Sequence, residues 1–542
     1  MDLMGSTNWL FTALEITSAL FVFILGIGVL ILFVVYLYDV SQSRKAILRN
    51  FPIIGHFRYM FERLGEFFRQ YFFAMDREEL PFNRAQRSWV YRAAKGISNT
   101  VAFGSTRDLG RPGTVIFVNA PFPTLDEDAV PVQPMLIGPY CAKPYIAKSF
   151  FNISGMSYGA ISRPAVIALT NGAAMSGCWL NSGEGGLSLY HLNSGVDLVF
   201  QIGTAKYGVR NPDGSLSDER LLELSNYEQL RMFEIKLSQG AKPGKGGILP
   251  GVKVTAEIAQ MRGIPVHEDS ISPNRHTDIS NVQDLLDSMA HIRRLTGRPV
   301  GFKAVLSGSE WLDELFQAVC QRGIESAPDF ITVDGADGGT GAAPMPLMDD
   351  VGLTLRESLP MLVDKLDEYG LRGRVRVIAS GKLITPTDVA WALCMGADFV
   401  NSARGFMFAL GCIQAMQCNR NTCPTGITTH NPRLQKGLDP ANKAVRVANY
   451  HRNLVHEVCI IAHSCGVREP RQFQRKHARI VMENGMSVPM STLHPAPQTG
   501  KYQERNSSGG LNSNDENAQA KQENEIEAGE IRQKTGTDCG SA

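Results

Sequence analysis

The sequence predicts an α/β protein built on a parallel β-sheet. Short apolar segments alternate with helical stretches from about residue 97 to residue 490. The apolar segments end in small or polar residues such as glycine, serine and asparagine, and a helix follows each of the later ones. Strand–helix repetition of this kind gives either an open doubly wound sheet or a closed (β/α)8 barrel. Both architectures place the chemistry at the C-terminal ends of the strands.

Seven segments are expected to be strands of that sheet. They are residues 151–157, 179–183, 198–203, 300–305, 329–335, 375–381 and 398–404. A well-marked helix follows the sixth strand, because Thr385 suits the N-cap, Pro386 suits the first helical position and Asp388 can bond back to the cap. We expect this helix to end near Gly396, before the seventh strand.

The composition limits the classes of function. The chain has 542 residues, and its 54 Lys and Arg nearly balance its 53 Asp and Glu. No overall positive field is therefore expected, and we expect no nucleic-acid partner. Seven of the ten cysteines show no framework spacing, which argues against a disulfide scaffold and indicates a reducing compartment.

An uncharged apolar run from Ile16 to Tyr38 precedes the strands. As a helix it is long enough to cross about 30 Å of hydrocarbon. A cleaved signal peptide is the alternative, but a signal has a basic start and a shorter apolar core. Here the basic residues follow the run, from Arg44 to Arg63, which places the C-terminal side in the cytoplasm. We therefore expect residues 1–45 to be a single-pass anchor in the inner (cytoplasmic) membrane, with a cytoplasmic catalytic domain.

Two further segments flank the main body, residues 97–490. Residues 46–96 are aromatic and basic and are expected to form juxtamembrane helices, with an ordinary amphipathic face as an equal alternative to a lipid site. Residues 491–542 are rich in Gln, Asn, Ser, Gly and Glu and poor in apolar residues. This tail is expected to be disordered.

Three cysteines gather in GCIQAMQCNRNTCPTG, residues 411–426. Their C-x5-C-x4-C spacing is too wide for the paired hooks of a zinc ribbon, and no fourth cysteine or suitably placed histidine completes a zinc set. Iron–sulfur clusters are held by thiolates, and three protein ligands suit a cluster that lacks one corner iron. The spacing favours such a cluster and leaves buried, unrelated cysteines as the alternative.

Glycine-rich turns mark other strand ends. DGADGGTGAAP (334–344) directly follows a strand, and its glycines let the backbone approach a phosphate. It matches neither G-x-G-x-x-G nor a P-loop, and GAKPGKGG (240–247) lacks a Ser or Thr after its second lysine. A tight structural turn is the alternative for each. Several such turns at consecutive strand ends favour a phosphate-bearing cofactor.

These motifs together resemble the FMN-binding synthase domain of glutamate synthase. More narrowly, they resemble the membrane-anchored, stand-alone glutamate synthase domain-containing proteins of bacteria. The resemblance runs from about residue 97 to 485 and rests on SGMSYGAIS, NSGEGG, QGAKPGxGG, ISPNRH, DGGTGAAP and GCIQAMQCNRNTCPTGI in the same order. It implies a (β/α)8 TIM barrel that holds FMN, with a [3Fe-4S] cluster on a three-cysteine loop after the last strand.

The resemblance also assigns roles by motif position. It implies three cluster ligands, which are Cys412, Cys418 and Cys423. It implies flavin contacts for Gly155, Met156 and Ser157 on the first strand, Gln201 and Lys206 on the third, and Lys303 on the fifth. Around the FMN phosphate it places Gly338, Gly339, Thr340, Ser380, Gly381, Ala403 and Arg404. The positions that hold 2-oxoglutarate and the iminoglutarate intermediate are Glu184, Gln239, Lys242 and Arg262.

Two departures from the family pattern bear on the substrate. Where glutamate synthase has an acid and a glutamine in KPGEGGQLPG, this chain has Lys245 and Ile248. One polar substrate contact is therefore missing. We also expect neither an N-terminal glutaminase domain nor a large C-terminal β-helical domain in this sequence.

The resemblance implies an oxidoreductase acting on CH–NH2 groups. The leading expectation is reductive amination of 2-oxoglutarate, through 2-iminoglutarate, to glutamate, with ammonia from outside or from a partner glutaminase. Electrons would come from a carrier protein or a membrane carrier. One alternative is a flavin oxidoreductase that acts on a different amino or oxo acid and exchanges electrons with the membrane. The other is a membrane-tethered flavin redox module without turnover.

Overall fold

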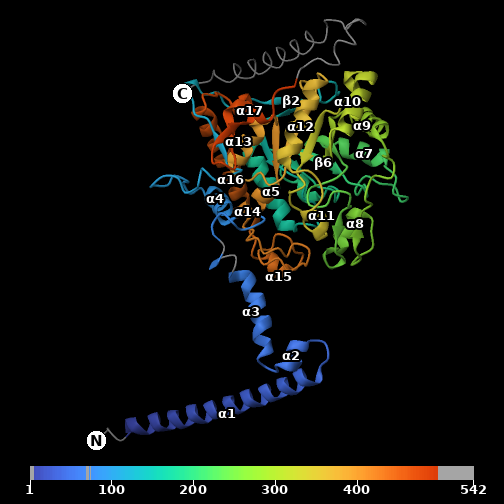
Figure 1. Ribbon diagram of the computed structural model, residues 1–542. Coiled ribbons are helices and arrows are strands. Elements are labelled where there is room, and N and C mark those ends of the chain that lie inside the picture. Colours follow the sequence, from blue (N-terminus) through green and yellow to red (C-terminus); the bar gives the residue numbers. More distant parts are fainter. Residues whose placement is uncertain (1–4, 69–71, 74, 498–542) are drawn as a thin grey trace, which may run out of the picture. The chain divides into compact units, whose positions relative to one another are not determined.

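The computed structural model describes residues 5–68, 72–73 and 75–497 (Figure 1). The chain divides into two compact units, Met1–Gln86 and Arg87–Ala542. The disorder predicted for residues 491–542 concerns residues outside the described part from position 498 onward, while the start of this segment is described and belongs to the helix Met490–Leu493.

The described residues of the first unit are helical over most of their length. α1 (Gly5–Ser41) contains the predicted apolar run and extends beyond it at both ends. Its stretch Phe11–Ser41 is long and apolar enough to cross a membrane, a criterion that a signal sequence also meets. Two shorter helices follow, α2 (Ala46–Asn50) and α3 (Gly55–Phe68).

A buried carboxylate ties the end of α1 to the start of α3. Asp39 accepts a hydrogen bond from the N–H of Ile53 at 3.0 Å and lies 2.9 Å from Nε2 of His56. Its side chain is fully buried, while that of His56 is 48% exposed. The turn between the two helices is therefore held in place by side chains as well as by the backbone.

The second unit is built on a closed barrel of eight strands, which confirms the predicted (β/α)8 class. Every neighbouring pair is parallel, and the pairing of the last strand with the first closes the barrel. In barrel order the strands are β4 (Phe151–Ile153), β5 (Leu180–Asn181), β6 (Leu198–Ile202), β7 (Leu230–Lys236), β10 (Val300–Ala304), β11 (Phe330–Asp334), β12 (Arg376–Ser380) and β13 (Phe399–Ser402).

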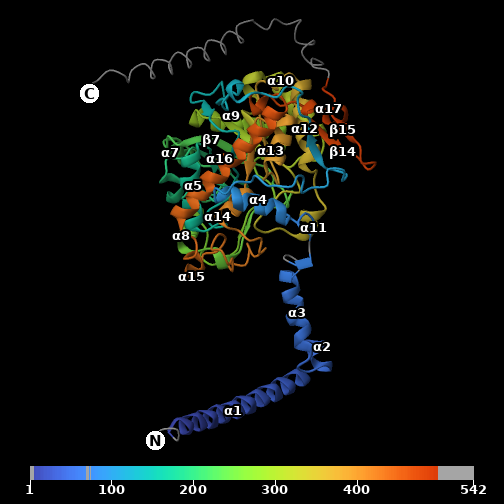
Figure 2. The same ribbon diagram turned by 90° about the vertical axis from the view of Figure 1, so that its left-hand side faces the viewer.

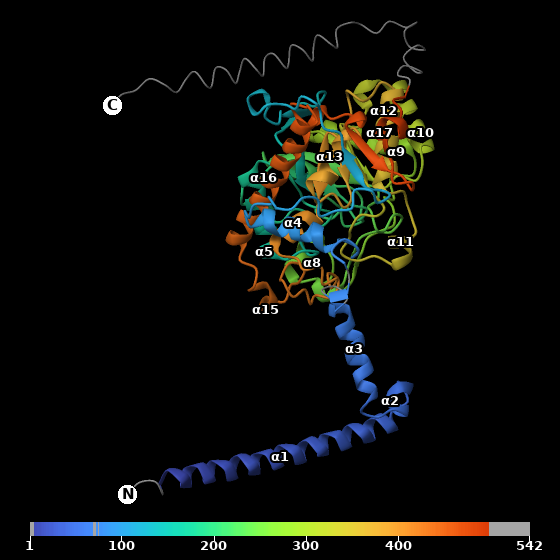
Figure 3. The same cartoon turned by 60° about the vertical axis from the view of Figure 1, so that its left-hand side comes forward.

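Helices connect these strands, as the alternating pattern predicts. They are α5 (Arg163–Ser176), α6 (Leu189–Leu192), α7 (Asp218–Ser225), α8 (Ala256–Arg262), α9 (Val282–Thr296), α10 (Glu310–Arg322), α11 (Met345–Asp349), α12 (Leu355–Glu368), α13 (Pro386–Cys394) and α14 (Arg404–Leu410). α9, α10 and α12 lie together on one side of the barrel (Figure 3). α5 packs against the long C-terminal helix α16 (Pro440–Ser464), as Figure 2 shows.

The helix predicted after the sixth segment is confirmed as α13, and its start is capped as expected. The hydroxyl of Thr385 accepts a hydrogen bond from the N–H of Asp388 at 3.4 Å. The carboxylate of Asp388 in turn accepts one from the N–H of Thr385 at 3.1 Å. This reciprocal arrangement is a capping box, with Pro386 at the first helical position.

One barrel strand, β7, is missing from the expected set. Its sequence LRMFEIK carries Arg231, Glu234 and Lys236, so it shows no continuous apolar run. Between β7 and β10 the chain makes a long excursion that contains α8 and the hairpin of β8 (Ile248–Leu249) and β9 (Ser270–Ile271).

An apolar cluster closes the N-terminal end of the barrel. Its members are Trp179, Val199, Met232, Phe330, Ile378 and Phe399 from the barrel, with Ile137, Tyr145 and Ala147 from the hairpin of β2 (Met135–Ile137) and β3 (Tyr145–Ala147). Trp179 is buried in the cluster and donates its indole N–H to Asn401 Oδ1 at 3.2 Å. Because these side chains occupy the N-terminal end of the barrel, the end available to a ligand is the opposite one, which is formed by the C-terminal ends of the strands.

The remaining elements pack around the barrel or follow it. They are α4 (Arg84–Ala94), α15 (Pro432–Gln435), α17 (Met490–Leu493) and a three-stranded antiparallel sheet of β1 (Val115–Phe117), β14 (Ala478–Val481) and β15 (Ser487–Pro489).

Candidate functional site

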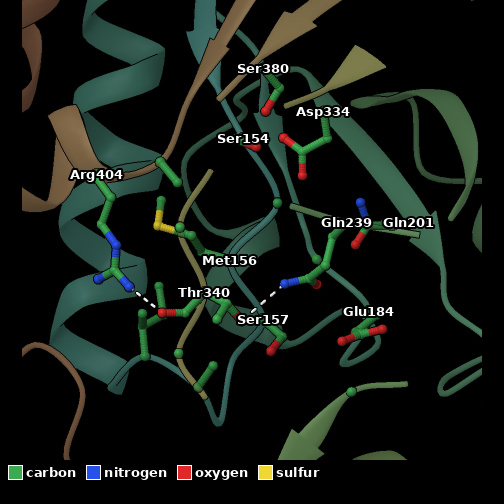
Figure 4. A pocket seen from close by; sticks show the side chains of 18 of the residues that line it. Ser154, Met156, Ser157, Glu184, Gln201, Gln239, Asp334, Thr340, Ser380 and Arg404 are labelled. Atoms are coloured by element: carbon green, nitrogen blue, oxygen red, sulfur yellow. Dashed lines mark hydrogen bonds between the residues drawn. The ribbon is translucent and has the colours of Figure 1, made fainter. Parts of the chain in front are cut away.

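A cavity open to solvent lies at the C-terminal ends of the barrel strands (Figure 4). Every strand contributes to its lining, either from its last residues or from the loop after it. In barrel order, one contributor from each is Ser154, Glu184, Gln201, Lys236, Lys303, Asp334, Ser380 and Asn401. Active sites of TIM barrels are built at this end.

Most residues expected at the site line this cavity. The expected substrate residues all do so, namely Glu184, Gln239, Lys242 and Arg262. So do most of the expected flavin contacts, namely Gly155, Met156, Ser157, Gln201, Lys303, Gly339, Thr340, Ser380, Gly381, Ala403 and Arg404. The first three of these follow β4 and are not part of the strand. The structure thus gathers segments that are up to about half the chain apart.

Two of the expected flavin contacts are not among the residues that line the cavity. The ammonium of Lys206 is buried and lies 2.8 Å from a carboxylate oxygen of Asp278, outside the cavity lining. Gly338 is in a tight turn, where its N–H donates to the carbonyl of Gly335 at 2.8 Å. These two residues therefore do not line the cavity, although residues close to them in sequence do.

A chain of hydrogen bonds crosses the cavity from β7. Lys236, which the missed strand contributes, lies 3.0 Å from Glu184 Oε2 and donates to Gln239 Oε1. The amide of Gln239 donates in turn to Thr340 Oγ1 at 3.0 Å, as Figure 4 shows. Because both ends of this amide are bonded, the orientation of Gln239 is defined.

Glu184 stays ionised in this environment. Burial raises the pKa of its carboxyl, but the charges of Lys236 and Lys242 outweigh burial and hold the pKa below its usual value. The site therefore presents a fixed carboxylate between two ammonium groups.

Lys242 is the unpaired cation of this group. Its side chain is buried, and in the described part of the chain its ammonium has neither an ion-pair partner nor a hydrogen-bond acceptor. Burial lowers the pKa of Lys242 to about 8, against the opposing attraction of Glu184. A buried charge without a partner is unfavourable, so an anionic ligand would gain from pairing with it.

A second lysine–carboxylate pair lies on the neighbouring strands. Lys303 Nζ is 3.1 Å from Asp334 Oδ2, and both side chains are buried. The same carboxylate oxygen accepts a hydrogen bond from the N–H of Gly240 at 2.8 Å. Burial raises the pKa of Asp334, but Lys303 and this N–H lower it further than burial raises it. The pair is therefore charged, and it fixes the loop that carries Gly240.

Arg262 is held at the cavity by contacts on two sides. Its guanidinium donates to Ser270 Oγ at 3.2 Å and to the carbonyl of Tyr158 at 3.3 Å, and it stacks over the ring of Tyr207. Among the described residues its Nε–H has no acceptor. The side chain is thus positioned, and it keeps a donor for an additional partner.

Three loops approach one another so closely that only glycine fits. A Cβ on Gly240 would lie 2.2 Å from the carbonyl oxygen of Gly335. Gly381 has φ +129° and lies beside the backbone of the same residue, and a Cβ on Gly339 would be 3.0 Å from Nε of Arg404. The turns at the ends of β7, β11 and β12 therefore form a backbone cradle next to an arginine, a suitable environment for a phosphate.

Glu234 is a buried carboxylate inside the barrel, and sequence analysis missed it. It accepts hydrogen bonds from Asn181 Nδ2 at 2.8 Å, Gln201 Nε2 at 2.6 Å and Thr332 Oγ1 at 2.6 Å. Because Nε2 of Gln201 is bound inward, its oxygen is left as the acceptor of this side chain. The side-chain oxygen of Asn181, Oδ1, accepts a hydrogen bond from the N–H of Gly183 at 2.9 Å.

The cysteine loop, residues 411–426, is strained and anchored. Gln414, Met416 and Asn421 all have positive φ angles, a conformation that non-glycine residues adopt at a cost of about 1 kcal/mol or more. Three donors hold the loop to different parts of the second unit. They are Tyr91 Oη to Cys412 O at 2.6 Å, Lys253 Nζ to Cys418 O at 3.2 Å and Asn421 Nδ2 to Val252 O at 3.1 Å.

The three thiols of this loop have different surroundings. Cys418 lines the cavity, 3.7 Å from the guanidinium of Arg404, while Cys412 and Cys423 are not among the lining residues. Burial raises the pKa of Cys412 to about 11. Burial also raises the pKa of Cys423, but hydrogen bonds from Thr425 and Thr428 outweigh it, so the pKa is lowered overall.

This loop supplies three candidate sulfur ligands, of which Cys423 has surroundings that favour the thiolate and Cys412 has surroundings that disfavour it. Hydrogen-bond donors around Cys423 favour its thiolate, the form that binds iron. As the side chains stand, the described residues contain no group of three or more His, Cys, Asp or Glu that could hold a metal ion. His430 lies outside this chemistry, because its Nε2 pairs with the carbonyl of Gly159 at 2.9 Å.

Comparison with known proteins supplies the family. Residues 126–468 match the model described as the conserved region in glutamate synthase. The chain is similar to the glutamate synthase large subunit-like protein YerD of Bacillus subtilis, with 39% identity over 520 residues that cover 88% of this chain and 98% of YerD. It is 34% identical to the archaeal glutamate synthase [NADPH] of Methanocaldococcus jannaschii, covering 60% of this chain and 61% of that protein. The chain therefore spans less than two thirds of the archaeal protein.

The environment of Glu234 generates a prediction. Glu234→Leu should leave three buried donors without an acceptor and lower the free energy of unfolding by at least about 3 kcal/mol, or about 1 kcal/mol for each donor. Urea unfolding followed by tryptophan fluorescence measures this change. Glu234→Gln is the matched control, since its remaining oxygen can serve Asn181 and Gln201 while the hydroxyl of Thr332 turns to accept. A leucine variant as stable as the wild type would refute the network.

Proposed function

The chain belongs to the glutamate synthase family, and we propose that it is an FMN- and iron–sulfur-dependent oxidoreductase that converts 2-oxoglutarate and ammonia to glutamate. The observation that carries the proposal is the unpaired, buried ammonium of Lys242 beside the Glu184–Lys236 pair, in a cavity at the catalytic end of a TIM barrel. The ammonium of Lys242 attracts a carboxylate of the substrate. The carboxylate of Glu184 can accept a hydrogen bond from the nitrogen that is added to the substrate.

FMN fits the remaining part of the cavity. The glycine cradle with Thr340 and Arg404 would hold the phosphate, and the segment Gly155–Ser157 with Gln201 would hold the ring. Bound FMN supplies hydride-transfer chemistry. The oxygen of Gln201, left free by Glu234, is an acceptor for an N–H of the ring system, and Lys303 adds positive charge on the adjoining strand.

The substrate contacts follow from the charges. Lys242 and Arg262 would neutralise the two carboxylates of 2-oxoglutarate and of 2-iminoglutarate. Glu184 is ionised and can accept a hydrogen bond from ammonia or from an iminium N–H, and Lys236 keeps this carboxylate charged. Gln239 is fixed by Lys236 and Thr340, so it offers a defined polar surface at the same place.

The cysteine loop would hold the iron–sulfur cluster through Cys412, Cys418 and Cys423, and a [3Fe-4S] cluster matches three ligands. Such a cluster supplies one-electron transfer. Cys418 lies at the cavity edge, which makes it the thiol nearest to a bound flavin. The electrons would come from a donor protein or a membrane carrier, and α1 would be the single-pass anchor of a cytoplasmic enzyme.

A second substrate is a candidate because of Ile248. This side chain lines the cavity together with Leu249, close to the charged group. Two apolar side chains at this position suit an oxo acid, or the corresponding amino acid, whose distal end is less polar than that of 2-oxoglutarate. The rest of the proposal is unchanged for that substrate.

The proposed function can be tested by reducing the flavin of the purified protein under anaerobic conditions and then adding candidate substrates. We expect 2-oxoglutarate with ammonium to restore the visible absorption of oxidised flavin and to yield glutamate, while either compound alone does neither. Parallel assays with apolar oxo acids and ammonium test the second substrate. Purified protein without flavin absorption would contradict the whole proposal, and restoration by none of the oxo acids would contradict a catalytic role.

The pKa of Lys242 predicts a pH dependence. Its ammonium is charged below about pH 8 and loses its proton above it. Binding of 2-oxoglutarate should therefore weaken as the pH rises from about 7 to about 9, where about a tenth of Lys242 stays charged in the free protein. Isothermal titration calorimetry measures this trend. Lys242→Met should bind weakly at every pH, and an unchanged pH profile in this variant would argue against the assignment.

The ligand assignment is tested by Cys418→Ser. Loss of one of three thiolates should lower the iron content of the purified protein to a small fraction, while the flavin content stays the same. Elemental analysis and visible spectroscopy measure the two quantities. Cys394→Ser, which changes a buried cysteine on α13, is the control and should keep both. Full iron content in the Cys418 variant would remove it from the ligand set.

A further inference from the structure

α3 carries an apolar stripe on one face. Phe57, Met60, Phe61, Leu64 and Phe68 recur at intervals of three, four or seven residues. Because an α-helix turns about 100° per residue, these five side chains share a sector about 100° wide. All five are exposed, Phe57 at 53% and Phe61 at 60%. A continuous apolar surface of this kind normally marks an interaction site.

The other face of α3 is polar, and its surroundings are basic. Arg58, Glu62 and Arg63 occupy this face and are exposed. From Gln42 to Phe68 the sequence contains five basic residues and two acidic residues. The segment therefore combines an apolar stripe with a net positive charge, which suits an anionic lipid surface.

The position of α3 in the chain adds an independent argument. It starts fourteen residues after the apolar span Phe11–Ser41, and the hydrogen bonds of Asp39 with Ile53 and His56 tie its first turn to the end of α1. If α1 crosses a bilayer, α3 begins where the chain leaves the hydrocarbon. Its stripe is then at the depth of the lipid headgroups.

We propose that α3 lies flat in the interfacial layer of an anionic bilayer. The stripe from Phe57 to Phe68 enters the boundary between headgroups and acyl chains, and Arg58 and Arg63 lie among the phosphates. The contact extends the membrane anchoring proposed for α1 and does not depend on the chemistry of the barrel. The chain is then attached to the membrane by two elements, a helix that spans the bilayer and a helix that lies on its surface.

Tryptophan scanning in the full-length protein tests this contact. Phe61→Trp places the probe in the stripe, and Glu62→Trp is the matched control on the polar face. Both variants are reconstituted in vesicles of phosphatidylcholine and phosphatidylglycerol with brominated or ordinary acyl chains, and the wild-type emission is subtracted. We expect bromine to remove most of the added emission in the Phe61 variant and little of it in the Glu62 variant.

The other outcomes each overturn the proposal. A blue-shifted probe at position 61 that bromine does not quench means that protein covers the stripe, either a second copy or another part of the chain. Equal quenching at both positions means that the segment is immersed and does not lie flat. Protein that fails to float with the vesicles contradicts the anchoring by α1 as well, and a measured flavin content shows separately whether the barrel is intact. Leu64→Trp repeats the test if the Phe61 variant does not fold.

Discussion

The charge balance at the C-terminal end of the barrel determines how this cavity is built. Six charged side chains from β7, β10, β11 and the loops after β5 and β7 are buried or partly buried there, where an unpaired ion is strongly unfavourable. Two pairs, Glu184 with Lys236 and Lys303 with Asp334, remove four of these charges from the balance. Lys242 and Arg262 remain without a carboxylate partner among the described residues. The positive excess of the cavity is therefore a consequence of the pairing, and the choice of an anionic ligand follows from it.

The fold was largely predictable because its signals are local. Strand–helix alternation, glycine turns and the capping box at Thr385 each depend on a few neighbouring residues. β7 was not predictable in this way, because Glu234 and Lys236 interrupt its apolar pattern. The burial of Glu234 is made possible by Asn181, Gln201 and Thr332 on other strands, and that of Lys236 by Glu184 and Gln239. A strand whose charges are satisfied only in the closed barrel has no local signature.

The site shows the same division. Residues in long motifs, such as Glu184, Gln239 and Arg404, were expected on the basis of a family resemblance and line the cavity. The motif could not reveal that Lys206 pairs with Asp278, because that contact joins two loops 72 residues apart. Nor could spacing reveal that Cys418 alone of the three cysteines reaches the cavity lining. That difference arises from the strained loop and from the donors that hold it.

The closure of the barrel also imposes an order on biosynthesis. β4 and β13 are hydrogen-bonded neighbours, although Phe151 and Ser402 stand at opposite ends of the barrel sequence. Since all eight strands line the cavity, it does not exist until the ribosome has released the last of them, and the three cysteines emerge later still. A nascent chain shorter than 402 residues therefore cannot form the complete cavity. A product truncated before Phe399 lacks the last strand, and with it both the closed cavity and the three cysteines.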